Sequence, residues 1–179
     1  MRLFFALWPP EDLSRALADG AEALARRFGG RPTRRETIHL TLAFLGEVDA
    51  ACVSGVIDAG RRAYAAPFQL VVDRFGYWRH NDLLWAGCTE PAEGLRSLVM
   101  ALRRQLRAAS IAFDAAPRFV AHLTLVRKAR IVRGEVDMIS LEPLRWPCSG
   151  FVLVHSRPAA GGREYAVLES FPLPAAARC

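Results

Sequence analysis

Apolar positions recur at helical spacing in three segments of the chain. The first lies between the prolines at 9–10 and the glycines at 29–30, which commonly precede and follow a helix. The second spans residues 49–66, through Val56, Ile57 and Tyr64, and the third spans residues 93–110. The third is the clearest, because its apolar residues share one face: Leu95, Leu98, Val99, Leu102 and Leu106. The pattern predicts three amphipathic helices.

Short runs rich in aromatic and β-branched residues lie between these helices and predict strands. They span residues 2–8, 37–46, 68–78, 82–88, 121–129, 151–157 and 163–173. The polar residues 79–81 predict a β-hairpin between two of these strands, and the glycines at 161–162 predict another. Because helices and neighbouring strand pairs are intermixed, an α+β fold is favoured over a doubly wound parallel sheet.

One four-residue word, His-Leu-Thr-Leu, occurs twice, at residues 39–42 and 122–125. The chain has four histidines and five threonines, and two of each lie in these two words. Chance is therefore a poor explanation of the repeat. The two words lie 83 residues apart, each on a predicted strand in its own half. This spacing suggests two similar lobes that each contribute one strand to a shared cleft.

Each repeat places an imidazole and a hydroxyl on the same face of its strand, because residues two apart point the same way. His39 and Thr41 share a face in the first copy, and His122 and Thr124 share a face in the second. Strict alternation places the apolar residues on the opposite faces: Leu40, Leu42, Phe44, Leu123 and Leu125.

Two imidazoles and two hydroxyls around one site suit phosphoester chemistry. One imidazole can accept a proton while the other donates one, and the hydroxyls can donate hydrogen bonds to phosphate oxygens. Packing alone would preserve the leucines more readily than the polar pair, because buried polar groups cost free energy without partners. A zinc site is disfavoured because neither word carries a carboxylate. The sequence predicts catalysis, with neither a metal nor another cofactor.

Composition sets broader limits. The 179 residues suffice for one domain, residues 1–179, and no long linker interrupts them. The formal net charge is +6, and Lys128 is the only lysine among 24 basic residues. This excess favours a polyanion such as RNA, although the richness in Ala, Arg and Gly also fits a GC-biased genome.

The remaining sequence features bear on location and assembly. The cysteines at 52, 88, 148 and 179 lack metal-binding spacing, which predicts free thiols in a reducing compartment. No signal peptide or membrane span is expected, so we expect a cytoplasmic protein without a membrane partner. No apolar stripe is left over for an obligate protein partner, so we expect a monomer.

The segments IHLTLAFLGEV and AHLTLVRK resemble the paired HxTx motifs of the two-histidine (2H) phosphoesterase superfamily. The bacterial RNA 2′,3′-cyclic phosphodiesterases, also called 2′-5′ RNA ligases, are the branch that the chain resembles. MRLFFALWPPEDL is similar to that branch's opening strand and helix, FGYWRHNDLLWAG to its central hairpin and FVLVHSRPAAGGREYAVLESFPL to its closing one.

This resemblance implies a bilobal fold with a pseudo-twofold axis, antiparallel sheets lining a central cleft and helices outside. It implies metal-independent hydrolysis of a ribose 2′,3′-cyclic phosphate to a 2′-phosphomonoester. His39 would be the proton donor, His122 the proton acceptor, and Thr41 and Thr124 would hold the phosphate. One departure is the segment GGRPTRRETIHL, which lacks the aromatic residue that members often carry before the first histidine.

Several residues outside the repeats are weaker candidates. Arg127 can contact phosphate only if a strand end or bulge turns it to the face of His122. Phe5 and Trp78 can stack on a base but fit a core or surface role better. Lys128 and Arg130 are expected to be solvated charges that flank the cleft. His80 and His155 are expected to be ordinary, because neither is followed by Thr two positions later.

Other activities remain open at this point. The same two histidines would serve a phosphodiesterase that cleaves 2′-5′ linkages or small cyclic phosphates of another nucleotide substrate, or the reverse 2′-5′ ligation, by microscopic reversibility. A basic RNA-binding module without activity is the alternative from another class.

Overall fold

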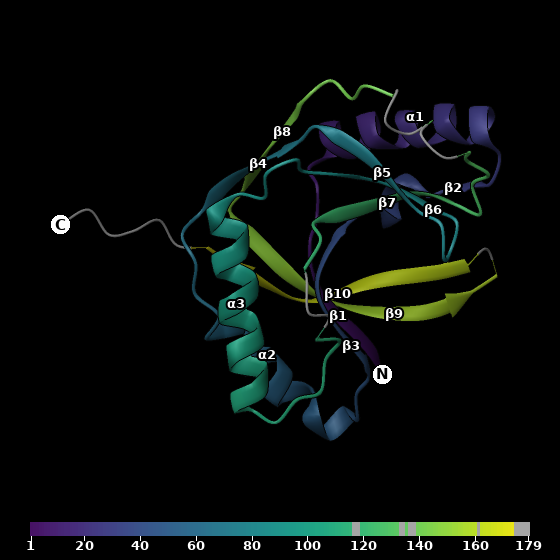
Figure 1. The fold of residues 1–179 in the computed structure, drawn as a ribbon. Helices are drawn as coiled ribbons and strands as arrows, with labels where there is room; N and C mark the ends of the chain where they lie inside the picture. Colours follow the sequence, from purple (N-terminus) through teal and green to yellow (C-terminus); the bar gives the residue numbers. More distant parts are fainter. Residues whose placement is uncertain (116–118, 133–134, 136–138, 161, 174–179) are drawn as a thin grey trace.

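We describe the fold from a computed structural model, which describes residues 1–115, 119–132, 135, 139–160 and 162–173 (Figure 1). Its helices are α1 (Glu11–Phe28), α2 (Val53–Arg61) and α3 (Glu93–Ala108), with short 3-10 turns η1 (Arg35–Thr37) and η2 (Ala50–Cys52). The strands of the first half are β1 (Arg2–Leu7), β2 (Arg31–Pro32), β3 (Leu40–Glu47), β4 (Phe68–Val72) and β5 (Arg74–Trp78). Those of the second half are β6 (Leu83–Gly87), β7 (His122–Arg127), β8 (Leu144–Cys148), β9 (Gly150–Ala159) and β10 (Gly162–Pro172).

The strands form one large antiparallel sheet and one small one. The large sheet runs in the order β10-β9-β1-β3-β7-β6-β5, and β2 pairs with β7 beside this path. The small sheet contains β4 and β8. Helices and antiparallel sheets are thus intermixed, so the predicted α+β class is confirmed.

The fold is built from a repeated strand–helix–strand unit. In the first unit β1 pairs with β3 and α1 lies between them in sequence; in the second, β6 pairs with β7 around α3. The two units join at the pair Leu40–Leu123, and both side chains are fully buried. Each leucine is the second residue of its His-Leu-Thr-Leu word, so the join lies between the two repeats.

The helix of each unit packs against a strand of the other unit. Helix α1 packs against β7 and β2, whereas α3 packs against β3, β4 and α2. Figure 1 shows α1 along one end of the molecule, near β7, and α2 and α3 together on another side. Because each unit's helix packs on the other unit's strand, the halves share one hydrophobic core.

The apolar faces predicted for the first and third helices are confirmed. Leu13, Leu17, Leu24 and Phe28 of α1 are buried, and so are all five of the apolar residues predicted for α3. The second helix was predicted too long. It ends at Arg61, and Tyr64 is 59% exposed.

The strand predicted over residues 68–78 is two strands that diverge at Asp73. Strand β5 pairs with β6 as the predicted hairpin, but β4 leaves that sheet and pairs with β8. Asp73 marks the break: its main-chain N–H donates to the Gly87 carbonyl, and its carboxylate accepts from the Thr89 N–H. The closing hairpin of β9 and β10 is confirmed, although Gly161 of its predicted turn lies outside the described residues.

The sequence predicted free thiols and no membrane-spanning segment. Within the described part of the chain, Cys52, Cys88 and Cys148 are free thiols, and Cys179 lies outside it. Burial raises the pKa of Cys88 to about 11 and that of Cys148 to about 12. None of the described helices is long and apolar enough to span a membrane.

Candidate active site

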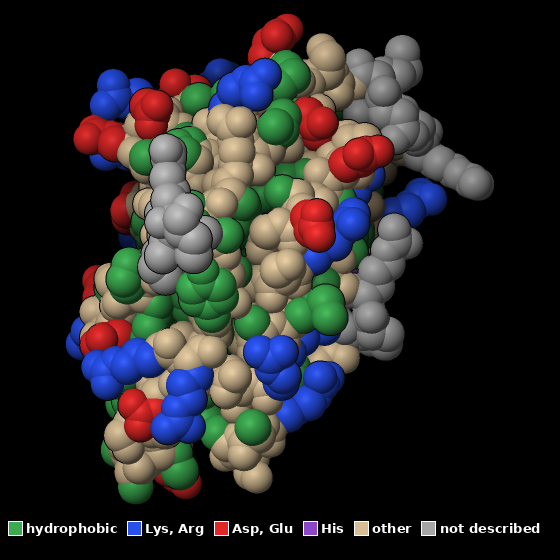
Figure 2. Space-filling view, turned by 90° about the vertical axis from the view of Figure 1, so that its left-hand side faces the viewer, with side chains coloured by type: hydrophobic (Ala, Val, Ile, Leu, Met, Phe, Trp, Pro, Cys, Tyr) green, Lys and Arg blue, Asp and Glu red, His purple; other side chains and the backbone are tan. Residues whose placement is uncertain are grey.

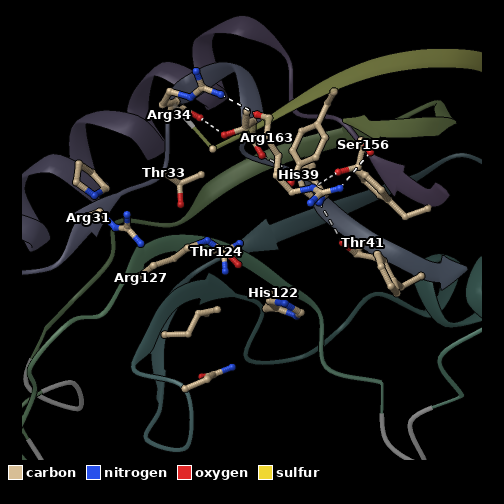
Figure 3. Close-up of a pocket in the computed structure, with 18 of the residues that line it drawn as sticks. Arg31, Thr33, Arg34, His39, Thr41, His122, Thr124, Arg127, Ser156 and Arg163 are labelled. Atoms are coloured by element: carbon tan, nitrogen blue, oxygen red, sulfur yellow. Dashed lines mark hydrogen bonds between the residues drawn. The ribbon is translucent and has the colours of Figure 1, made fainter. Parts of the chain in front are cut away.

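A cleft of about 710 Å³ lies where the two units meet (Figure 3). Both histidines and both threonines of the repeats line it, together with Arg127. The antiparallel register around the Leu40–Leu123 pair explains the arrangement. Thr41 and His122 each lie one residue to one side of that pair, and His39 and Thr124 each lie one residue to the other side, so all four are held next to the join. The sequence repeat thus becomes one shared site.

The orientation of the His39 ring is fixed by its main-chain surroundings. Nδ1 lies 2.7 Å from the Thr37 carbonyl oxygen, which can only accept, so Nδ1 carries a proton and donates it. Nε2 lies 3.1 Å from the Thr41 hydroxyl oxygen. In the neutral ring Nε2 is therefore an acceptor, and it is the nitrogen available for proton transfer.

The second histidine repeats this arrangement. His122 Nδ1 lies 2.9 Å from the Val120 carbonyl oxygen and donates to it. In both copies the carbonyl belongs to the residue two positions before the histidine. The same tautomer is therefore set twice, and Nε2 is the nitrogen left for chemistry on each ring.

A β-bulge follows each histidine–threonine pair. On β3, Ala6 pairs with Thr41 and Phe5 with Ala43, so Leu42 is an extra residue. On β7, Trp85 pairs with Thr124 and Leu84 with Val126, so Leu125 is an extra residue. A bulge re-aims the side chains beyond it.

The bulge on β3 shows that the orientation predicted for Phe44 was wrong. The bulge on β7 provides the irregularity that Arg127 was predicted to need in order to reach the cleft. Phe44 was predicted to face away from His39, but the bulge on β3 turns it into the cleft beside Thr41. The bulge on β7 does the same for Arg127, which lines the cleft with His122. The fifth residue after each histidine thus faces the site, and it is aromatic in one copy and cationic in the other.

Burial and charge lower the proton affinity of both imidazoles. The pKa of His39 falls from 6.5 to about 4, chiefly because burial disfavours the charged ring, with contributions from the charges of His122 and Arg127. The Thr37 carbonyl opposes this shift. The pKa of His122 is also lowered, by burial first and then by Arg127, against the effect of the Val120 carbonyl. Perturbed pKa values in a cleft are typical of acid–base sites.

Comparison with known proteins places this geometry in a family. The family described as LigT like Phosphoesterase matches residues 7–85. The RNA 2′,3′-cyclic phosphodiesterase of Escherichia coli (strain K12) is 32% identical over 174 residues, covering 96% of each chain. That of Thermus thermophilus is 34% identical over 185 residues, covering 97% of this chain and 90% of the relative. The chain belongs to the LigT-like phosphoesterases.

Structural comparison agrees for the whole LigT-like fold. The crystal structure of E. coli LigT complexed with 3′-AMP matches with a TM-score of 0.83 at 28% identity, covering 96% of this chain and 97% of that one. The Thermus thermophilus structure TT0787 matches with a TM-score of 0.79 at 31% identity, covering 99% and 100%. The fold predicted from the resemblance is therefore confirmed.

Aromatic rings surround His39 in this LigT-like site. The Trp8 indole stacks on the imidazole with ring centroids 5.4 Å apart and an interplanar angle of 9°. Phe4 and Tyr165 lie at 4.8 Å and 5.2 Å from the same ring. These rings are part of a small apolar cluster on the cleft side of the sheet. They hold the imidazole in place and exclude water from it.

Four further arginines line the cleft, and two of them are tied down. Arg163 donates to the hydroxyl and carbonyl oxygens of Ser156, and Arg34 donates to the Arg163 carbonyl at 2.7 Å. These bonds link the loop before β3 to the β9–β10 hairpin (Figure 3). The guanidinium of Arg2 lies 4.7 Å from the centre of the Phe44 ring, and Arg31 is the fourth.

Of the weaker candidates from the sequence, some line the cleft and others do not. Trp78 lines the cleft and its ring centroid lies 4.5 Å from that of His122, whereas Phe5 is fully buried in the core. His80 is exposed in the β5–β6 turn, and His155 is half-buried on β9. Lys128 and Arg130 are exposed and are not among the residues that line the cleft.

Trp8, Phe4, Tyr165, Arg31 and Ser156 were missed from the sequence. For two of them a signal existed: Phe4 and Trp8 lie four residues apart in RLFFALW, and strand alternation places them on one face.

A second hollow of about 410 Å³ adjoins the cleft at Thr41, Phe44, Trp78 and His122. In the described part of the chain, no group of three or more His, Cys, Asp or Glu side chains is placed to bind a metal ion.

Proposed function

We propose that this protein hydrolyses the 2′,3′-cyclic phosphate at the end of an RNA chain to a 2′-phosphomonoester. The observation that carries the proposal is the pair of imidazoles in one cleft, each with Nδ1–H bound to a carbonyl, so that Nε2 is the nitrogen for proton transfer; that of His39 lies 3.1 Å from the Thr41 hydroxyl oxygen. Relatives that align with nearly the whole chain bear the name of this activity. A relative of the same fold binds 3′-AMP, which supports a nucleotide ligand.

The reaction needs one proton acceptor and one proton donor. We assign these roles to His122 and His39 from the resemblance to the family. His122 Nε2 takes a proton from water as the water oxygen bonds to phosphorus, and the bond from phosphorus to O3′ breaks. His39 Nε2–H gives its proton to O3′, which leaves a 3′-hydroxyl and a 2′-phosphomonoester. Acid and base catalysis of this kind typically contribute about 10²–10⁴-fold each.

Hydrogen-bond donors in the cleft suit the charge on the phosphate. The hydroxyls of Thr41 and Thr124 donate to the non-bridging oxygens, and Arg127 supplies a cation on the same face. The negative phosphate between the imidazoles raises both of their pKa values. This charge offsets the effect of burial, so that His39 holds its proton in the complex nearer neutral pH.

The terminal nucleoside fits the aromatic side of the cleft. Phe44 and Trp78 line both the cleft and the adjoining hollow, next to the histidines. Base–aromatic stacking is tolerant of base identity, so we expect weak discrimination among the four bases. We also propose that the enzyme acts as a monomer in the cytoplasm, which the free thiols of the three described cysteines support.

The test is hydrolysis with EDTA present, using a nucleoside 2′,3′-cyclic phosphate and an RNA oligonucleotide that ends in one. Phosphorus NMR assigns the product as a 2′- or 3′-phosphate. We expect a 2′-phosphate from the wild type, and a loss of at least about 10²-fold in kcat for His39→Ala and for His122→Ala. His155→Ala, on β9 outside the cleft, is the matched control.

Three outcomes would contradict the proposal in different ways. A rate that collapses with EDTA would replace the two-imidazole mechanism with a metal-dependent one. Turnover of a 2′-5′ linkage in place of the cyclic phosphate would assign the other phosphodiesterase activity. RNA binding without turnover of any substrate would make the protein a binding module.

A further inference from the structure

The carbonyl that holds the His39 ring belongs to a short turn with little anchoring of its own. Thr37, whose carbonyl oxygen accepts from His39 Nδ1 at 2.7 Å, is the last residue of η1. None of the three residues of η1 is buried, and no side chain caps the turn. Turns of this type have weak hydrogen-bond geometry. The Thr37 carbonyl therefore depends on contacts between η1 and the rest of the molecule to keep its place.

Arg34, the residue before η1, connects the turn to the β9–β10 hairpin. Its carbonyl oxygen accepts from the Thr37 N–H at 2.9 Å and from the Thr37 hydroxyl at 2.8 Å. Its guanidinium donates to the Arg163 carbonyl on β10 at 2.7 Å. Arg34 Nε also lies 3.3 Å from a carboxylate oxygen of Glu36, which supports this orientation of the side chain. One residue thus binds Thr37 with its main chain and the hairpin with its side chain.

Arg163 is fixed in turn to the neighbouring strand. Its guanidinium donates to the hydroxyl and carbonyl oxygens of Ser156 on β9, and Ser156 is only 4% exposed. Figure 3 shows the bonds from Ser156 to Arg163 and from Arg163 to Arg34. Hydrogen bonds joined by short stretches of main chain therefore lead from a buried serine on β9 to the His39 ring.

The second histidine is supported from a different part of the molecule. His122 Nδ1 donates to the Val120 carbonyl. The loop before His122 is joined to β3, because the Asp114 N–H donates to the Phe44 carbonyl at 2.8 Å. The two rings are thus held by the same kind of bond, but only the support of His39 passes through the β9–β10 hairpin.

Loss of its carbonyl partner would weaken His39 as a proton donor. Donation of a proton from Nε2 leaves the neutral ring with its proton on Nδ1, which is the tautomer that the Thr37 carbonyl stabilises. The same carbonyl raises the pKa of His39 against the effect of burial. Without this partner the neutral ring would also populate the other tautomer, and the charged ring would be less stable.

We propose that Arg34 and Arg163 are positioning residues for His39, which set its tautomer and the direction of Nε2 through the Thr37 carbonyl. The β9–β10 hairpin then controls one of the two imidazoles and leaves His122 unaffected. The kinetic consequence rests on the proposed function, in which His39 is the proton donor. The consequence for the ring itself does not.

The first test observes the ring directly, without substrate. Nitrogen NMR of the two imidazoles at about pH 7.5, where both are neutral, distinguishes the tautomers. In the wild type we expect the proton on Nδ1 of both rings. Arg34→Ala should shift His39 to a mixture of tautomers, whereas Arg34→Lys, which can still donate to the Arg163 carbonyl, should restore the wild-type signal. The His122 signal should not change, which shows that the site is still folded.

The second test is kinetic, on an RNA that ends in a 2′,3′-cyclic phosphate. Arg34→Ala should lower kcat by about five-fold or more with little change in KM, because a positioning residue acts on the chemical step. Ser156→Ala removes the other end of the chain of bonds and should act in the same direction. Because both changes interrupt one network, the double variant should lose no more than the larger of the two single losses.

Arg35→Ala is the matched control. Arg35 lies on the same turn but connects it to α1, with its guanidinium 3.5 Å from a Glu11 carboxylate oxygen, and it is not among the residues that line the cleft. A control for charge is needed because basic side chains are not confined to the cleft: Figure 2 shows them among acidic ones on the face over α3. Arg35→Ala should keep the wild-type tautomer of His39 and the wild-type kcat.

The outcomes separate this inference from the proposed function. A His39 signal that is unchanged in Arg34→Ala overturns the inference, and so does an equal change in Arg35→Ala, because loss of one charge from the turn would then suffice. A higher KM with unchanged kcat overturns it as well, since Arg34 would then bind the substrate itself. If Arg34→Ala also disturbs His122, Ser156→Ala carries the NMR comparison. If the wild type hydrolyses no substrate, the proposed function fails, and the NMR comparison still decides the role of Arg34.

Discussion

The indole of Trp8 and the imidazole of His39 are stacked, with planes 9° apart. Tyr165 meets the same imidazole edge-on at 86°. An aromatic face attracts a cation, so the stacked indole favours the imidazolium form of His39. Burial, to which the same rings contribute, disfavours that form and lowers the pKa of His39 to about 4. Trp8 therefore acts on His39 in two opposite ways, and substitutions can separate them.

Trp8→Leu keeps an apolar cover over His39 but removes the aromatic face. We expect the pKa of His39 to fall further, and kcat/KM to decrease by about 2- to 30-fold, which corresponds to about 0.5–2 kcal/mol of cation–π stabilisation. Trp8→Phe keeps an aromatic face and should recover most of the loss. The pKa is measured by NMR titration of the ring. A Leu variant that matches the Phe variant in both rate and pKa would contradict this positioning role.

The pH dependence of kcat/KM reports the two histidines in the free enzyme. Both pKa values lie below 6.5, with that of His39 at about 4. In the proposed mechanism one imidazole carries a proton and the other does not, so we expect a bell-shaped profile with both limbs at or below about pH 6.5. The profile of kcat should lie at higher pH, because the bound phosphate raises both pKa values. An alkaline limb of kcat/KM above pH 7 would contradict the burial of these rings.

Much of the fold and the centre of the site could be predicted from the sequence. The helical spacing in residues 93–110 predicted the buried face of α3 because one side of that helix packs on the core. The repeated His-Leu-Thr-Leu word predicted two strands in one cleft. This prediction succeeded because the alternation of side chains depends only on neighbouring residues within one strand. It also succeeded because Leu40 and Leu123, where the strands join, are fully buried.

What the sequence did not show depends on pairing between distant segments. Phe44 and Arg127 enter the cleft through bulges, and a bulge is defined by the partner strand. Arg31 joins the site because two residues of β2 pair with the end of β7. The divergence of β4 from β5 depends on β8, which lies more than 60 residues later in the chain. Periodicity within one segment carries no information on these contacts.

The depressed pKa of His39 also predicts how stability depends on pH. The unfolded chain binds a proton at His39 below about pH 6.5, whereas the folded chain does so only below about pH 4, so the free energy of unfolding rises with pH over this range. The contribution of His39 amounts to about 3 kcal/mol between pH 4 and 6.5. His39→Gln should remove it. Urea denaturation of both proteins at the two pH values measures the difference, and equal pH dependence would contradict it.

Two glycine substitutions should shift stability in opposite directions. A Cβ at Gly30 would lie 2.6 Å from the Arg127 carbonyl oxygen, and its φ of +91° disfavours an L side chain. We therefore expect Gly30→Ala to lower the free energy of unfolding by about 1–3 kcal/mol. Gly20 lies inside α1, where a Cβ would meet nothing within 4 Å, so Gly20→Ala should raise it by about 1 kcal/mol.

The same two glycine variants also test whether β2 positions Arg31 and Arg127 at the cleft. Since Gly30 contacts the main chain of Arg127, Gly30→Ala should reduce kcat/KM on an RNA ending in a cyclic phosphate, even under conditions where the variant is fully folded. Gly20→Ala should keep the wild-type value. Thermal denaturation and kinetics on the same preparations give both readouts. A Gly30→Ala variant that is destabilised but has unchanged kinetics would show that the close approach of β2 to β7 serves stability alone.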